Sequence, residues 1–335
     1  MITCALDTFK CNFCKSGTLL PLQWTLADYE YDLQIDTNCS LLQCDCCSIL
    51  IQHPLPSKQQ IKHFYPQNYT NHSASYPKLM SILFNLNDRL EMLWLKKLIK
   101  QRMSSSSFSS SSSTSHDQVQ AQTCNIRILD IGCANGRFLL YLKKHLNWEV
   151  FGTEADIKFV MHLRKDLRGK KRIQLYIGDP ENIEFNSQKF DIIRMNDTIE
   201  HLRDPHASLN KLHSLLSPHG IIVGQTPNTD SFDFKIFKTY WGNLHMPRHI
   251  HLFNKKNLKQ LLQQIAFKNI EILDTIHPGG AALGMQNLLR NFCNIKLSQG
   301  KAAIYPLLLV GLLPLSVFQK LVKKPGIIRF VANKQ

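Results

Sequence analysis

The sequence predicts an α/β fold in which a mostly parallel, doubly wound sheet is covered by helices on both faces. After residue 125, short apolar runs alternate with amphipathic stretches whose apolar residues recur every three or four positions. A loop containing Gly132 and Gly136 follows the first apolar run, as is typical of the first strand–helix turn of such sheets. The predicted strands are 126–131, 149–153, 173–177, 190–195, 220–225, 269–275 and 326–332, and the predicted helices are 136–146, 156–167, 205–216 and 255–266.

The composition restricts the classes of protein to which the chain can belong. Its 335 residues suffice for two domains or for one enlarged domain with appendages. With 44% hydrophobic and 19% charged residues, and without a G-X-Y period, the chain is neither wholly disordered nor collagen-like. The net charge of +15 favours anionic partners such as nucleic acid, nucleotide-linked substrates or acidic lipids. Eight basic and no acidic residues fall in 275–335, so more than half of the excess charge lies there.

The N-terminal region carries the spacing of a structural zinc site. Seven of the ten cysteines lie within residues 1–47, and the first residues contain neither a basic leader nor a long apolar run. We therefore expect no secretory signal and a reducing, cytoplasmic environment, where clustered cysteines hold metal more often than they form disulfides. Two Cys-x2-Cys pairs supply the four thiolates that tetrahedral Zn²⁺ needs: Cys11, Cys14, Cys44 and Cys47. The competing ligands are Cys4, Cys39 and Cys46, and reduced cysteines without metal are the alternative.

Segments of contrasting composition divide the chain. We expect a zinc ribbon over 1–56, a helical segment over 57–103 that packs near the substrate site, a Ser-rich linker over 104–118, a core over 119–275 and an appendage with the final strand over 276–335. The linker contains SSSSFSSSSSTS, which has no apolar face to bury. In the helical segment, the predicted buried face carries Leu79, Leu83, Leu86, Leu90, Leu93 and Trp94.

The loop after the first predicted strand of the core, LDIGCANGRF, is the strongest functional signal. Asp130 ends the strand, and the spacing of Gly132 and Gly136 departs from the G-x-G-x-x-G of dinucleotide sites, which makes NAD a weaker fit. Glu154 ends the second strand, where a carboxylate can accept both hydroxyls of a ribose, and Asp179 follows the third, placed for an adenine amino group. The alternative is that the loop is an ordinary strand–helix turn and that each acid is a solvated residue at a strand end. Three acids at the ends of three successive strands favour a nucleoside ligand instead.

Five motifs in this order resemble those of class I S-adenosylmethionine-dependent methyltransferases: LDIGCANG, GTEAD, GD, FDIIRMNDTIEHLRDP and GIIVGQTPN. The resemblance implies a Rossmann-like sheet of seven strands, the last antiparallel, with S-adenosylmethionine as the cofactor. The cofactor-binding residues that it implies are Asp130, Gly132, Cys133, Gly136, Glu154, Asp179 and Asn196. The resemblance implies that Gly132 and Gly136 flank the methionyl part of S-adenosylmethionine and that Asn196 lies near its sulfonium. Ala134 occupies a position where glycine is common in this family.

A later segment, WGNLHMPRHIHLFNKKNLKQLL, resembles a subgroup that methylates small hydroxylated metabolites such as sugars, nucleotide sugars and quinone precursors. Some members of this subgroup carry N-terminal zinc modules. The chain lacks an Asp/Asn-Pro-Pro-aromatic tetrapeptide and a Pro-Cys pair, hallmarks of many nucleic-acid methyltransferases, which disfavours nucleic acid as the acceptor. The predicted reaction therefore moves a methyl group to an oxygen or carbon of a small molecule. The alternatives are an RNA methyltransferase, suggested by the ribbon and the charge, and a non-catalytic membrane-associated scaffold.

Histidines in two segments are the candidates for a catalytic base. Methyl transfer to a hydroxyl or an acidic carbon benefits from a base that titrates near pH 7, and histidine meets that requirement. His201 follows the fourth predicted strand and is expected to face the transferring methyl, with His249 as the second candidate. His245 and His251 lie in the same later loop as His249, and a structural role is the alternative for each of these residues.

The apolar segment 302–318 is the last signal. It is interrupted by Pro306, Gly311 and Pro314, and it is shorter than the roughly 20 residues of a spanning helix. Three interpretations remain: packing on the domain or on a second subunit as a homodimer, insertion into the membrane interface, and a true span. Because lysines flank the segment, we expect 290–324 to dock on an anionic membrane surface, which predicts a peripheral location at the inner membrane face.

Overall fold

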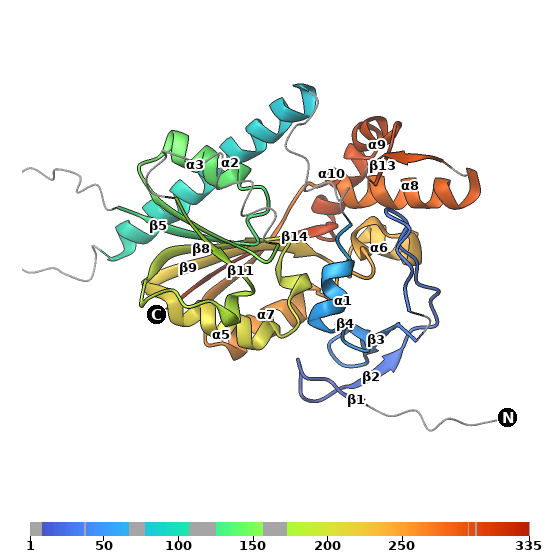
Figure 1. Ribbon diagram of the computed structural model, residues 1–335, viewed down its shortest axis with the longest axis horizontal. Helices are drawn as coiled ribbons and strands as arrows, with labels where there is room; N and C mark the ends of the chain where they lie inside the picture. Colours follow the sequence, from blue (N-terminus) through green and yellow to red (C-terminus); the bar gives the residue numbers. More distant parts are fainter. Residues whose placement is uncertain are drawn as a thin grey trace, which may run out of the picture. The chain divides into compact units, whose positions relative to one another are not determined.

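The computed structural model describes residues 9–36, 38–66, 78–106, 125–156, 173–293, 295–298 and 300–334 (Figure 1). The predicted helix 156–167 lies outside the described residues beyond its first position, and so does the Ser-rich linker beyond residue 106. Cys4, one of the competing zinc ligands, also lies outside the described residues.

A seven-stranded sheet confirms the predicted Rossmann-like class. Its order is β11-β14-β9-β8-β5-β6-β7. Neighbouring strands β5, β6 and β7 are parallel, whereas the last strand, β14, is antiparallel to both β9 and β11. The strands span Arg127–Ile131 (β5), Glu149–Glu154 (β6), Ile173–Ile177 (β7), Phe190–Asn196 (β8), Leu216–Pro227 (β9), Lys268–Asp274 (β11) and Ile327–Asn333 (β14).

The chain divides into two compact units, and strand β8 runs from one into the other. The smaller unit consists of residues 71–193 and 215–220. The larger unit consists of residues 1–70, 194–214 and 221–335.

In the smaller unit, helix α2 (Lys78–Ser106) packs on helix α3 (Arg137–His145). The guanidinium of Arg137 pairs with the buried carboxylate of Asp88 on α2 and lies 4.9 Å from the centre of the Phe84 ring. The predicted buried face of α2 is wrong, because three of its leucines, Leu86, Leu90 and Leu93, are exposed. Among the side chains of α2 that the structure describes, the buried apolar ones are instead Met92, Leu95 and Ile99, at helical spacing on another side of the helix. The side chains of Leu79 and Leu83 lie outside that description.

In the larger unit, the N-terminal strands form a second sheet of order β1-β2-β3-β4-β10. The strands are Phe9–Lys10 (β1), Thr18–Pro21 (β2), Ser40–Cys44 (β3), Leu50–His53 (β4) and His251–Leu252 (β10). Strand β10 pairs antiparallel with β4, with His251 opposite Ile51, so a segment far along the chain completes the N-terminal sheet. Leu41 and Leu50 share a buried cluster with Trp241. The N-terminal module, which contains β1 to β4, is therefore joined to the loop 245–252 by strand hydrogen bonds and by a shared hydrophobic cluster.

Among the described residues of the larger unit are seven α-helices, and polar side chains cap the start of three of them, with Ser231 accepting from the amide of Phe234 at the start of α6. Ser57 and Gln60 form a capping box at the start of α1, and Asn254 and Asn257 form another at the start of α7. The helices are Lys58–His63 (α1), Pro205–Leu215 (α5), Phe232–Phe237 (α6), Lys255–Gln264 (α7), Gly279–Cys293 (α8), Tyr305–Gly311 (α9) and Leu313–Leu321 (α10). A short hairpin of β12 (Leu297–Ser298) and β13 (Lys301–Ala302) precedes α9.

The apolar segment 302–318 forms two short helices rather than one long one. Helices α9 and α10 meet at Leu312, and Pro306 and Pro314 occupy the first turn of each, where proline is tolerated. Across the residues that the structure describes, no helix is both long enough and apolar enough to cross a membrane.

Candidate functional site

Four cysteines of the N-terminal module lie together in the geometry of a tetrahedral metal site. The sulfur atoms of Cys11 and Cys47 are 3.7 Å apart, those of Cys14 and Cys44 are 3.6 Å apart, and all four lie within 4.8 Å of one another. Zn–S bonds of about 2.3 Å place tetrahedral sulfurs roughly 3.8 Å apart, so these residues fit zinc. The competing candidates Cys39 and Cys46 are not part of this cluster.

Backbone groups support two of these sulfurs. The amide of Gly17 donates to Sγ of Cys14 at 3.3 Å, and the amide of Cys46 donates to Sγ of Cys44 at 3.4 Å. A Cβ on Gly17 would lie 2.4 Å from Sγ of Cys44, so only glycine allows this approach. Donation from N–H groups stabilises thiolate, which is the form that binds metal.

The candidate cofactor loop of the smaller unit connects β5 to α3. Its backbone is left-handed at Gly132 (φ 69°), Ala134 (φ 47°) and Gly136 (φ 67°), and Gly136 is the N-cap of α3. The amide of Ala134 donates to Oε2 of Glu154 at 2.9 Å, which ties the loop to the end of β6. A Cβ on Gly152 would lie 2.8 Å from Sγ of Cys133, so a glycine on β6 is what lets the loop lie against that strand.

The side chain of Glu154 is held by backbone amides at this sheet edge. Its Oε1 accepts a hydrogen bond from the amide of Asp156 at 3.1 Å. Burial raises the pKa of this carboxyl above its usual range, and the amides of Asp156 and Ala134 partly offset that effect. Each carboxylate oxygen keeps a further lone pair, so Glu154 can still accept hydrogen bonds from the hydroxyls of a ribose.

Asp179 lies at the same edge, because β6 and β7 are parallel and Glu154 stands opposite Ile177. It is the N-cap of the short helix Pro180–Asn182. The acids and the loop therefore supply acceptors and close backbone approach at the carboxyl ends of adjacent strands, which fits the adenosyl part of S-adenosylmethionine. Asp130 is buried at the end of β5, and Asn196 ends β8 in the larger unit.

Three histidines of the larger unit stand in a row. The ring centres of His201 and His249 are 4.6 Å apart, and those of His249 and His245 are 5.0 Å apart. His201 comes from the short helix Ile199–His201 that follows β8, and the other two come from the loop before β10. The structure therefore brings together the first and second candidates for the base.

Backbone carbonyls orient two of these rings. Nδ1 of His201 is 2.9 Å from the carbonyl oxygen of Arg248, and Nδ1 of His249 is 2.8 Å from that of Asn243. Because a carbonyl oxygen only accepts, each Nδ1 carries the hydrogen and each Nε2 keeps a lone pair. Burial lowers the pKa of His201 to about 4 and that of His249 well below its usual range, so both rings are neutral at pH 7. The expectation of a base that titrates near pH 7 is therefore not met, because burial makes both imidazoles weaker bases than a solvated histidine.

A buried carboxylate completes the cluster. Oε2 of Glu200 accepts a hydrogen bond from the hydroxyl of Thr226 at 2.9 Å, while its Oε1 has no hydrogen-bond partner and lies 3.9 Å from Nε2 of His249. Burial raises the pKa of Glu200 well above its ordinary value. One ligand atom from each of Glu200, His201 and His249 lies within 4.8 Å of the others, so this trio could hold a cation.

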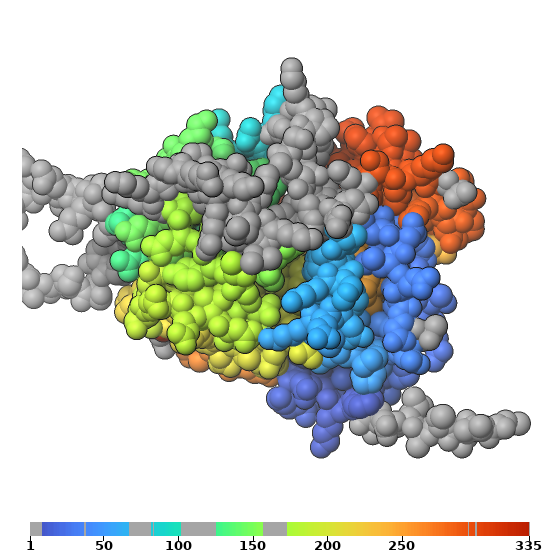
Figure 2. Space-filling model, in the orientation of Figure 1, coloured from blue at the N-terminus to red at the C-terminus, as the bar shows by residue number. Residues whose placement is uncertain are grey.

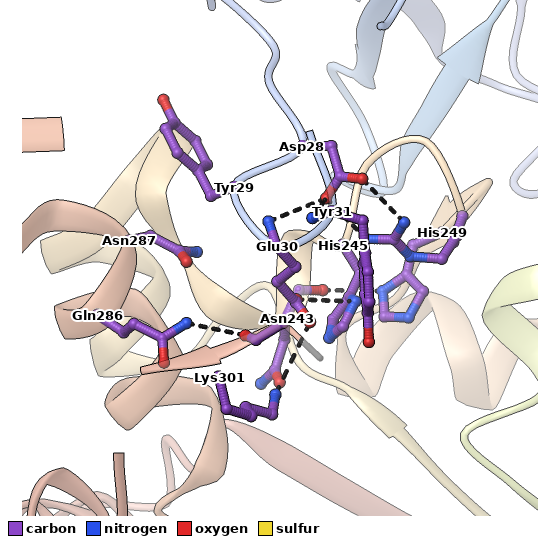
Figure 3. Close-up of polar contacts among 12 residues, drawn as sticks. Asp28, Tyr29, Glu30, Tyr31, Asn243, His245, His249, Gln286, Asn287 and Lys301 are labelled. Carbon is purple, nitrogen blue, oxygen red and sulfur yellow. Dashed lines mark hydrogen bonds and ion pairs between the residues drawn. The ribbon is translucent and has the colours of Figure 1, made fainter. Parts of the chain in front are cut away.

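A network of charged side chains surrounds the histidine row. Oε1 of Glu30 lies 3.1 Å from Nδ1 of His245, and Oε2 of Glu30 lies 3.7 Å from Nζ of Lys301 (Figure 3). The guanidinium of Arg248 is paired with Asp28. A cavity of only about 10 Å³, roughly the space of one water molecule, adjoins these residues and is lined in part by Asp28, Glu30, Trp241, Leu244, His245 and Asn287. The arrangement places neutral imidazoles, which can accept a proton, beside paired charged side chains.

A family model described as "Methyltransferase domain" matches residues 94–272, which is more than half of the chain. The chain belongs to this family. That match covers strands β5, β6, β7, β8 and β9 together with the histidine row. The resemblance predicted from the five motifs is therefore confirmed.

Among the most similar curated proteins, this methyltransferase family member is 26% identical over 116 residues to phosphoethanolamine N-methyltransferase 3 of Arabidopsis thaliana, covering 33% of this chain and 24% of that protein. It is 29% identical over 134 residues to a ubiquinone biosynthesis O-methyltransferase of Cereibacter sphaeroides, covering 39% of this chain and 53% of that protein. The chain thus spans about a quarter to a half of the length of these relatives. A solved phosphoethanolamine N-methyltransferase 2 of Haemonchus contortus, in complex with S-adenosyl-L-methionine, aligns at 20% identity with a TM-score of 0.44, covering 63% of this chain and 49% of that one.

Several residues of the candidate site were not predicted from the sequence. Gly152 carries a signal in the motif GTE, since a glycine inside a strand often marks close backbone approach. Glu200 directly precedes the predicted base. Glu30 and Lys301 carry no local signal, because only the folded chain brings the N-terminal module and the appendage to His245. His251, by contrast, is a buried residue whose ring contacts that of Phe13 in a tilted arrangement, with ring centres 5.3 Å apart, which favours its structural role.

Proposed function

We propose that the chain transfers a methyl group from S-adenosylmethionine to an oxygen or carbon of a small hydroxylated molecule of the sugar, nucleotide-sugar or quinone class. The observation that carries this proposal is the His201–His249 pair, in which two neutral imidazoles present Nε2 lone pairs beside the buried carboxyl group of Glu200. Family membership supports the cofactor, and the absence of nucleic-acid hallmarks in the sequence supports a small acceptor.

The cofactor supplies a methyl group that is already activated by its sulfonium, so the protein contributes orientation and proton transfer. We infer that Glu154 binds the ribose, that Asp179 binds the adenine, and that the Gly132–Gly136 loop lies against the methionyl part. His201 takes the proton of the acceptor hydroxyl at Nε2, while its Nδ1–H bond to the carbonyl of Arg248 keeps that ring in the required tautomer. His249 is the second candidate for the same role.

We also infer that Cys11, Cys14, Cys44 and Cys47 hold one structural Zn²⁺. Four thiolates fill a tetrahedral shell and leave no position for an activated water, so the ion contributes to folding rather than to chemistry. The sheet that carries these cysteines pairs through β4 with β10, which follows the histidine loop. A folded zinc module therefore fixes the end of the loop that contains His249.

One labelling experiment separates this proposal from its rivals. The full chain is incubated with methyl-labelled S-adenosylmethionine and a cell extract that has been divided into small-molecule, RNA and protein fractions. We expect label in the small-molecule fraction, and we expect the Glu154→Ala variant to lose it. Salt-sensitive label in the RNA fraction would favour an RNA methyltransferase. Cofactor binding without label in any fraction would favour a non-catalytic scaffold.

A further inference from the structure

Helix α10 exposes several large apolar side chains to solvent and buries two polar ones, while Leu315 packs on the core. Ser316 and Gln319 are each 1% exposed, whereas Leu321 is 76% exposed. Leu313 and Val317 precede Leu321 at intervals of four residues, so the three share one exposed face. The Nε2 atom of Gln319 is buried without a hydrogen-bond partner. This is the reverse of the polarity expected for a helix that faces only water.

Exposed apolar side chains also occur on α9, which contacts α10, and on α6. Leu307 and Val310 on α9 are 74% and 72% exposed and lie three residues apart. On α6, Phe232 contacts Phe318 of α10 edge to face, with ring centres 5.7 Å apart, and both rings are partly exposed. We define the apolar face as Phe232, Ile236, Leu307, Val310, Leu313, Val317, Phe318 and Leu321. Helices α8 and α9 form part of the orange surface at the upper right of Figure 2.

The charges beside the apolar face are positive. Lys320 and Lys323 are exposed on either side of Leu321 and Val322, and Lys324 follows them. No acidic residue occurs in the sequence after Asp274. On α6, Lys235 lies 3.6 Å from Asp230, so that pair adds no net charge. An occupant of this face must therefore offer an apolar surface bordered by negative charge.

We propose that the apolar face docks on an anionic lipid bilayer, with α9 and α10 lying in the interface. A bilayer of acidic lipids offers hydrocarbon for the leucines and phosphate for the lysines. A second copy of the chain would instead bring these lysines against their own counterparts, which disfavours self-association through this face. Helix α10 has nine residues and is about 14 Å long, less than half of the hydrocarbon thickness, so the segment lies on the membrane rather than across it.

This inference goes beyond the proposed methyl transfer and does not depend on the acceptor. Liposome flotation of the full chain tests it, with neutral phosphatidylcholine vesicles compared with vesicles that contain phosphatidylglycerol. We expect the protein to float with the anionic vesicles at low salt, and we expect high salt or neutral lipid to release it. A chain that stays at the bottom of the gradient with anionic vesicles at low salt would overturn the proposal.

Matched variants locate the binding surface. The double variant Lys320→Gln/Lys323→Gln should lower the partition coefficient roughly 30-fold, whereas Lys259→Gln/Lys268→Gln, which removes two exposed lysines elsewhere, should change it little. The apolar variant Leu313→Gln/Leu321→Gln should also abolish flotation, while the exposed pair Leu86→Gln/Leu90→Gln on α2 should not. Equal effects of the test and control variants would contradict the assignment. A dimer that dissociates in Leu313→Gln/Leu321→Gln, without flotation of the parent chain, would assign the face to a second copy.

Discussion

The buried guanidinium of Arg248 donates to both carboxylate oxygens of Asp28, a residue 220 positions earlier in the chain. The two distances are 3.1 and 2.9 Å, and the side chains are 0% and 1% exposed. The carbonyl oxygen of the same arginine accepts the hydrogen bond from Nδ1 of His201. The N-terminal module therefore holds, through Asp28, the loop that orients the candidate base.

The Arg248–Asp28 pair should contribute strongly to stability. The substitution Asp28→Ala leaves a buried guanidinium without its carboxylate, which should lower the free energy of unfolding by about 3–5 kcal/mol. Urea denaturation monitored by fluorescence measures this. As a control, Asp32→Ala removes a carboxylate that pairs with Arg290 but is itself 74% exposed. This substitution should lower the free energy of unfolding by less than about 1 kcal/mol. Similar losses in the two variants would contradict the structural role given to the buried pair.

Replacing the candidate base should affect turnover more than cofactor binding. Because a general base typically contributes about 10²- to 10⁴-fold, we expect His201→Gln to lower kcat by that order and to leave the affinity for S-adenosylmethionine nearly unchanged. Initial rates on the acceptor found by labelling, together with calorimetry, measure both quantities. The exposed His145 provides the control substitution, His145→Gln. Unchanged turnover with weakened cofactor binding would place His201 at the cofactor instead.

The buried histidines predict acid sensitivity. Burial lowers the pKa of His251 to about 4, compared with about 6.5 in an unfolded chain. Between pH 6.5 and pH 4 the unfolded chain therefore binds more protons than the folded one, so the free energy of unfolding falls as the pH is lowered through this window. His201 adds a second group of the same kind. Substituting His251→Asn should reduce the slope of the free energy of unfolding against pH by up to about 1.4 kcal/mol per pH unit in this window. A pH dependence identical to that of the parent chain would contradict this account.

The four-cysteine site should retain zinc through purification. Metal analysis should find about one equivalent in the parent chain, and Cys44→Ser should lose the ion together with part of the thermal stability. The neighbouring Cys46→Ser is the matched control, because Cys46 is exposed and contributes only its amide to the site. Full zinc content in Cys44→Ser, or loss of zinc in Cys46→Ser, would overturn the ligand set.

The parts of the fold that the sequence predicts are those with local signals. The βα alternation, the Gly132–Gly136 loop and the two Cys-x2-Cys pairs each depend on residues close together in the chain, and the structure contains all three. Strand and helix ends differ by a few residues, as at β9, which begins at Leu216 rather than at residue 220.

The parts that the sequence misses depend on distant contacts. Helix α2 has leucines around its circumference, so periodicity alone could not identify the buried side, which is fixed by the pairing of Asp88 with Arg137. The approach of Asp28 to Arg248 and of Glu30 to Lys301 arises only when the N-terminal sheet accepts β10 as its last strand. The inward polar face of α10 likewise follows from tertiary packing rather than from its own sequence.

Calorimetric titration with S-adenosylmethionine tests the central claim, that the edge of β5 and β6 binds this cofactor, most directly. Glu154→Ala removes the acceptor assigned to the ribose, and Glu149→Ala, at the opposite end of the same strand, is the matched control. We predict binding to the parent chain and to Glu149→Ala, with affinity reduced about 5- to 150-fold in Glu154→Ala. No binding to the folded parent chain, or equal affinity in all three proteins, would contradict the cofactor site described here.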